Sequence, residues 1–114
     1  MSEEKLLDDR DVIHVYRGGG VHARVVPAEG DGYPLRHVVR HSPTGFEYGY
    51  GGSGPADLAL SMLTAVLGKE QANRLYQAFK RDRIAAESGE HWSMKAETIR
   101  EWAEHEEAAA RARR

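Results

Sequence analysis

The twenty residues from His41 to Leu60 constrain the fold more than any other stretch, because they hold five glycines and two prolines. Glycine loses more backbone freedom on folding than any other residue, so this density indicates unusual backbone angles or close backbone approach. A strand-like pattern precedes the run and an apolar helical pattern follows it. We therefore expect the chain to change from strands to helices here, and the run is the first place to seek a functional site.

Length and composition narrow the class of protein. The chain has 114 residues, the size of one domain, and no cysteine, which excludes disulfides, thiolate metal sites and a cysteine nucleophile. No apolar run reaches about 18 residues, and the acidic N-terminal segment is unlike a signal peptide. We therefore expect a cytoplasmic protein that does not associate with membranes.

The net charge of −2 is unevenly distributed, with −3 on residues 1–11, +3 on residues 12–84 and −2 on residues 85–114. A mildly basic body can meet nucleic acid or an acidic protein face. An ordinary mixed surface has the same balance, so charge alone leaves both interpretations open.

Before the glycine run, the pattern predicts an antiparallel meander. Residues 12–17 and 21–26 are strand-like and are separated by glycines, which indicates a hairpin. A third strand is expected over residues 35–41. A tight turn over residues 42–45 then leads to a short fourth strand over residues 46–49.

After the glycine run, the pattern predicts helices. Residues 55–67 are apolar except for one narrow polar stripe that includes Asp57, which predicts an almost wholly buried helix. Residues 69–87 predict a second helix, and Ser93 is expected to cap a third.

These elements predict an α+β fold, with a small antiparallel β-meander of about four strands followed by the glycine-rich loop and three helices packed on one face. We expect a single domain over residues 12–104. A flexible acidic arm at residues 1–11 precedes it, and a solvated helical tail at residues 105–114 follows it.

The glycine loop supplies candidate ligand or partner residues, namely Tyr48, Tyr50, Gly51, Gly52, Ser53, Gly54 and Asp57. Its G-x-G-x-x-G pattern matches the dinucleotide fingerprint, but residues 69–87 have a helical pattern where the fingerprint needs a returning strand. Ser53 lacks the second glycine of a nucleophile elbow, because Pro55 stands there. Two alternatives remain: a structural turn in which Asp57 accepts backbone N–H groups, and an ordered loop that also contacts a partner or small ligand.

The histidines do not predict a metal site. His37 and His41 have the spacing of a helical metal pair, but residues four apart on a strand are separated by roughly 13 Å. We therefore expect no metal ligands.

Alternation along the strands places polar side chains on one sheet face, opposite Ile13 and Val15. Cations interleaved with aromatic rings on an open sheet can stack on and neutralise a nucleic-acid strand, or meet an acidic partner. The candidate residues for this face are His14, Tyr16, His22, Arg24, Arg36 and Arg40. A plain solvent-facing sheet would show the same pattern.

Residues 41–57, HSPTGFEYGYGGSGPAD, resemble the HSPTGFEWGYGGSGPA signature of a small uncharacterised prokaryotic family of unknown function found on phages and plasmids. Tyr48 stands where that signature has a tryptophan, and the likeness extends from Val12 to Trp102. The resemblance implies a small accessory protein that modulates a host or defence machine. It implies no established reaction.

We expect a non-catalytic binding protein, with no catalytic residues and no cofactor, that engages a host protein or nucleic acid. One alternative is an enzyme or small-ligand binder in which the Gly51–Gly54 loop holds an anionic or sugar-like group and Asp57 or a histidine acts as acid or base. Another alternative is a structural homo-oligomer formed through the tryptophans and the C-terminal helix.

Overall fold

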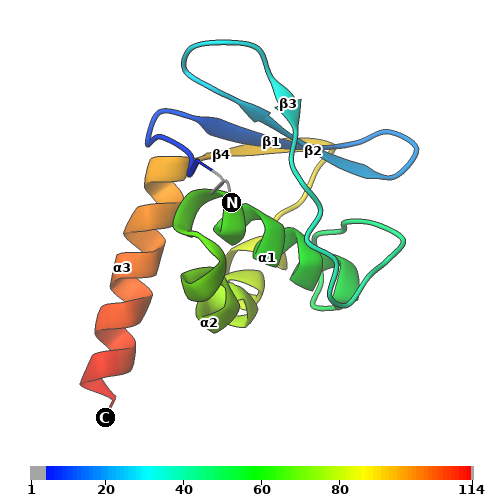
Figure 1. The fold of residues 1–114 in the computed structure, drawn as a ribbon. Helices are drawn as coiled ribbons and strands as arrows, with labels where there is room; N and C mark the ends of the chain where they lie inside the picture. The colour runs from blue at the N-terminus through cyan, green and yellow to red at the C-terminus, as the bar shows by residue number, and fades with distance from the viewer. Residues whose placement is uncertain (1–4, 114) are drawn as a thin grey trace.

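A four-stranded antiparallel sheet is covered on one face by α-helices, which confirms the expected α+β class (Figure 1). The computed structural model describes residues 5–113. The strand order is β3-β2-β1-β4, so β1 (Val12–Arg17) lies between β2 (Val21–Val26) and β4 (His91–Lys95). At the far edge, β3 (Tyr33–Pro34) is only two residues long.

The hairpin of β1 and β2 forms as predicted. Ile13 and Val15 alternate with less buried residues and are fully buried, so this face of β1 packs on the helices. The turn is made of glycines because Gly19 and Gly20 adopt positive φ angles of 66° and 120°, which other residues rarely tolerate.

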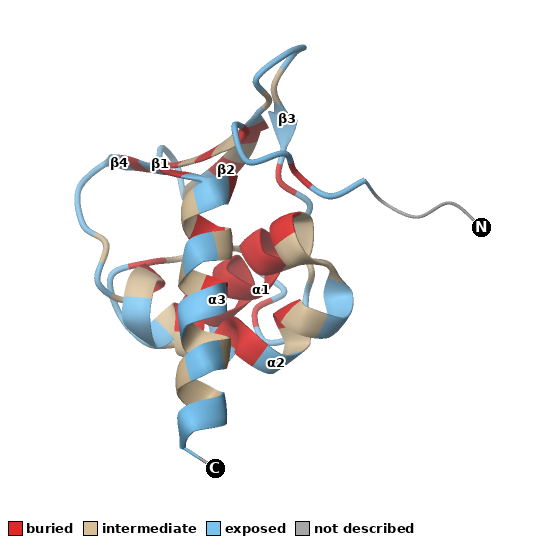
Figure 2. Cartoon of the chain, turned by 90° about the vertical axis from the view of Figure 1, so that its left-hand side faces the viewer, coloured by how far each residue is buried: buried red, intermediate tan, exposed pale blue. Residues whose placement is uncertain are grey.

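The centre of the core is helix α1 (Ser53–Leu67), in which Leu58, Met62 and Leu63 have no exposed surface. Gly68, with φ of 91°, ends this helix and allows α2 (Lys69–Phe79) to begin at once. A π-helical segment, η1 (Lys80–Ile84), extends α2, and the last helix is α3 (Ala96–Ala112). Figure 2 shows the buried residues concentrated on α1 and on the parts of α2 and the sheet that surround it.

Two of the predicted strands are wrong. Residues 35–41 form no strand. The N–H group of Leu35 still donates to the carbonyl of Ala23 at 2.9 Å, but Val38, Arg40 and His41 donate to side chains of α1 instead. The N–H group of Val38 donates to Ser61 Oγ at 2.8 Å. In place of a strand over residues 46–49, Phe46 makes a single isolated bridge to Val21.

The fourth strand comes from a segment where a helix start was predicted. Ser93 does not cap a helix but lies in β4, where Trp92 and Met94 alternate inward and are buried. Helix α3 instead begins at Ala96, directly after the strand. The predicted second helix over residues 69–87 is also shorter, because α2 and η1 together end at Ile84.

The predicted acidic arm is attached to the domain from Leu7 onward, and residues 1–4 lie outside the described part. Leu7 is buried, and its N–H group donates to the carbonyl of Ala65 at 3.0 Å. The Asp11 carboxylate accepts the N–H groups of Asp8 and Ala28 at 2.8 and 2.9 Å. Residues 105–112 of the predicted tail are the last part of α3, in which Glu106, Glu107, Ala109 and Ala110 are half-buried, and Arg114 lies outside the described part. None of the helices within residues 5–113 has the length and apolar character needed to cross a membrane.

Candidate functional site

No helix of the described chain covers the sheet surface that faces away from the core (Figure 1). We call this surface the outer face. The strand register arranges its residues in three rows. These rows are Pro34, Arg24, His14 and Ser93, then His22, Tyr16 and His91, and finally Val26, Val12 and Lys95.

The outer face carries two pairs of planar rings. His14 and His91 stack with ring centroids 5.2 Å apart and planes within 15°, and the two rings share a hydrogen bond of 3.0 Å. The rings of Tyr16 and His22 lie 5.3 Å apart and are tilted by 30°. His22 and His91 are exposed and their ring partners are half-buried, and planar rings that reach the surface can stack on nucleobases.

The outer face is also cationic. It carries Arg24 and Lys95, and neither forms an ion pair with any residue between 5 and 113. None of the positions in the three rows is an Asp or Glu. The local charge is therefore positive although the whole chain carries −2, which favours an anionic partner on this face.

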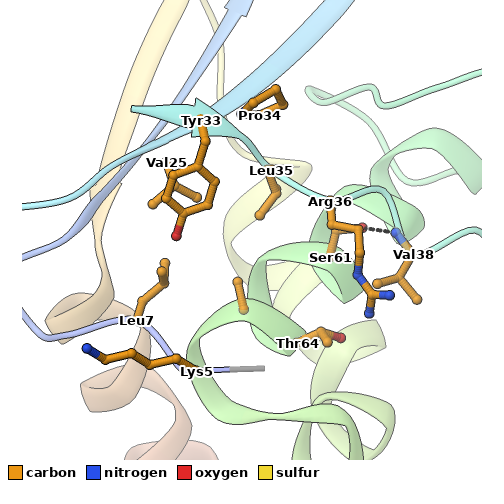
Figure 3. A pocket seen from close by; sticks show the side chains of 11 residues that line it. Lys5, Leu7, Val25, Tyr33, Pro34, Leu35, Arg36, Val38, Ser61 and Thr64 are labelled. Atoms are coloured by element: carbon orange, nitrogen blue, oxygen red, sulfur yellow. Dashed lines mark hydrogen bonds between the residues drawn. The ribbon is translucent and has the colours of Figure 1, made fainter. Parts of the chain in front are cut away.

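The structure brings together four residues of the predicted face, His14, Tyr16, His22 and Arg24, but not the other two arginines. Arg36 lies on the helix side, where it lines a hollow of about 300 Å³ beside Val38 and Ser61 (Figure 3). The guanidinium of Arg40 lies 5.8 Å from the ring centre of Tyr76 in α2. Both were misplaced because residues 35–41 are not a strand.

Asp57 is fully buried and anchors the irregular segment before the glycine loop. Its carboxylate accepts the N–H groups of His41 and Ser42 at 2.9 and 3.0 Å, that of Arg40 at 3.2 Å, and Nε2–H of His37 at 2.9 Å. Burial alone would raise the pKa of the Asp57 carboxyl, but the hydrogen bonds, that of His37 foremost, lower this pKa below its ordinary value. Asp57 thus remains an ionised acceptor that fixes the segment from His37 to Ser42.

A groove of about 330 Å³ opens between the outer face and this irregular segment. Tyr16, His22 and Arg24 line it from the hairpin. His37 and Phe46 line it from the other side, with ring centroids 4.5 Å apart. The groove therefore joins the outer face to the imidazole that Asp57 orients.

The glycine loop is built mainly for packing. Tyr48 is buried, and its ring packs edge-on against the ring of Trp92. The guanidinium carbon of Arg17 lies over the Tyr48 ring, 4.2 Å from its centre. A Cβ atom on Gly54 would lie 2.8 Å from Cβ of Glu47, so only glycine fits there. Gly49 has a φ of 89°, in the left-handed region that favours glycine.

The predicted loop residues therefore divide into two groups. Tyr50, Gly51 and Ser53 are exposed and Gly52 is half-buried, so these residues are accessible to a partner. Tyr48, Gly54 and Asp57 are buried and can act only through the residues that they hold.

Sequence reasoning missed His91 and Lys95, because their segment was interpreted as leading into a helix. The alternation of His91, Ser93 and Lys95 with buried Trp92 and Met94 was the signal that could have found them. It also missed that His37 borders the groove, because no local pattern points to that placement. Between residues 5 and 113, no three His, Cys, Asp or Glu side chains lie close enough together to hold a metal ion.

Comparisons with known proteins give a family and no activity. The model of a family of unknown function, DUF6166, matches residues 16–105, which include the glycine loop and all of the outer face except Val12 and His14. Searches of curated proteins and of solved structures found no match. Since the family model matches most of the sequence, the chain belongs to the DUF6166 family.

Proposed function

We propose that this protein is a non-catalytic binding protein that holds single-stranded nucleic acid on the outer face of its sheet. The observation that carries the proposal is the composition of that face: two ring pairs, each with one exposed ring, and two cations without an ion pair among residues 5–113, with no carboxylate in any row. Stacking on a ring contributes about 1–3 kcal/mol per base and tolerates any base. Cations then neutralise the adjacent phosphates.

A single strand fits this face better than a duplex does. The rings of His14 and Tyr16 lie on the central strand, and their ring partners lie on neighbouring strands. Flat rings on a sheet can reach the unstacked bases of a single strand, whereas the bases of a duplex stack on one another. The resemblance of residues 41–57 to a phage and plasmid signature supports an accessory role for this binding in the cytoplasm, on a strand of the host or of the mobile element.

The experiment measures fluorescence anisotropy of labelled single strands at several salt concentrations. Each phosphate neutralised on a single strand contributes about −0.7 to the slope of log affinity against log salt. The double variant Arg24→Gln/Lys95→Gln should therefore flatten the slope by about 1.4 and weaken binding. The matched control, Lys69→Gln/Arg111→Gln, removes the same charge from exposed residues of α2 and α3. It should change neither the salt slope nor the affinity.

Three results would refute the proposal. The first is that no strand binds. The second is that the control variant loses as much affinity as the face variant, which would mean that only net charge matters. The third is that polyglutamate displaces the strand at equal charge, which would favour an acidic protein as the partner.

A further inference from the structure

We propose that the groove beside His37 is a pocket for a single nucleotide, supplied either free or as one residue of a bound strand. For a strand nucleotide, the inference rests on the proposed function. For a free nucleotide, it stands independently. The groove is shared by the hairpin and by the segment that Asp57 fixes, so it brings together groups from distant parts of the chain.

The first supporting observation is the free nitrogen of His37. Its Nε2–H group donates to the ionised Asp57 carboxylate at 2.9 Å, and in the tautomer that makes this bond Nδ1 is left as an acceptor. Within residues 5–113, His37 makes no other hydrogen bond. Its Nδ1 atom is not buried and is therefore accessible to solvent. His37 lines the groove, and an acceptor on a ring held in place fits an N–H donor such as those on the edges of nucleobases.

The second observation is the shape and lining of the groove. Its volume of about 330 Å³ is at the small end of ligand pockets, which suits one planar ring with its substituent. The rings of Phe46 and Tyr16 form part of its walls, and Leu35 and Pro34 add apolar surface. A flat heterocycle can be buried against such walls by stacking.

The third observation is Arg24, which lines the same groove and has no ion-pair partner between residues 5 and 113. A guanidinium binds phosphate oxygens through two parallel hydrogen bonds. A nucleotide has the three features that the groove matches, namely a ring edge with a donor, a flat face and an anionic group.

The test follows the ring nitrogens of His37 by ¹⁵N NMR while nucleoside 5′-monophosphates, the matching nucleosides, inorganic phosphate or a short strand is added to the full chain. We expect at least one monophosphate or the strand to shift the Nδ1 resonance. Arg24→Gln should weaken monophosphate binding about tenfold, the loss of one charge-assisted contact, and leave nucleoside binding unchanged. Lys95→Gln lies on the outer face but outside the groove, and it should not affect free monophosphates.

Each result has a distinct meaning. A shift with free monophosphate shows that the nucleotide alone is sufficient, and a shift with the strand alone shows that the nucleotide must belong to a strand. If the strand binds by anisotropy while His37 does not respond to any ligand, the pocket is refuted and the proposed function is retained. If inorganic phosphate gives the same response as the monophosphates, the groove binds an anion only and the inference is refuted. If His37 responds to monophosphates but no strand binds, the pocket is retained and the proposed function fails.

Discussion

Replacing Asp57 with asparagine tests whether one buried carboxylate holds the segment from His37 to Ser42. The change preserves side-chain volume but turns one acceptor oxygen into an NH₂ donor. In the better of the two asparagine orientations, the remaining oxygen replaces Oδ2 and keeps the hydrogen bonds of His37 and Ser42. The N–H group of His41, 2.9 Å from Oδ1, then faces another donor.

The expected loss of unfolding free energy has two parts. One buried donor without an acceptor costs about 1–3 kcal/mol, and hydrogen bonds to a charged group lose part of their strength when the charge is removed. The sum is about 3 kcal/mol, which corresponds to a decrease in melting temperature of about 10–15 °C for a domain of this size. Urea denaturation and calorimetry measure both values. The control is Asp31→Asn at an exposed loop position, which should change stability by less than about 0.5 kcal/mol.

The difference in unfolding free energy between the wild type and Asp57→Asn should also depend on pH. Because the folded-state pKa of Asp57 lies below its unfolded value, ionisation of this carboxyl stabilises the fold above an unfolded pKa of about 3.9. That stabilisation is lost as the pH falls through the folded-state pKa. The difference between the wild type and Asp57→Asn should therefore be constant near neutral pH and shrink below about pH 4. A difference under about 1 kcal/mol at pH 7, or one that grows in acid, would refute this account of the segment.

Further predictions concern the glycine loop. Gly54→Ala should lower stability by about 1–3 kcal/mol, because the new Cβ atom would press on Glu47. Gly51→Ala, which has no atom within 4 Å of its new Cβ, should change stability by less than about 0.5 kcal/mol. Equal effects in urea denaturation would show that the loop is not a packing element. Tyr48→Phe removes the hydroxyl that donates to the carbonyl of Gly89 and should cost about 1 kcal/mol, whereas no loss would mean that this hydrogen bond adds nothing to stability.

The sequence predicted the parts of the fold that depend on local pattern. Alternation identified the hairpin of β1 and β2, and an apolar run after Pro55 identified the buried helix α1. It failed for residues 35–41, whose Val38 and Val39 are typical of a strand. A strand also needs a neighbour to complete its ladder, and here the donors bond to Ser61 and Asp57 instead. No local sequence pattern predicts these hydrogen bonds, because they join segments that are distant in the chain.

Only part of the candidate site was predicted, because alternation identifies the face of a strand but not its pairing with a distant strand. His14, Tyr16, His22 and Arg24 lie on strands identified by their pattern, so their common face followed from alternation. His91 depended on the pairing of β4 with β1, which joins segments far apart in the chain.

The most distinctive sequence motif of this chain supports the candidate site rather than forming it. Asp57 fixes the backbone from Arg40 to Ser42 and orients His37, while the close packing of Gly54 on Glu47 places α1 against the loop. Substitutions at these buried positions should therefore change stability first, and binding only as a consequence. Substitutions of Arg24 or Lys95 should do the reverse, because neither takes part in an ion pair between residues 5 and 113. A motif can thus be long and specific because it holds a neighbouring groove in shape, even where most of its own side chains never touch a ligand.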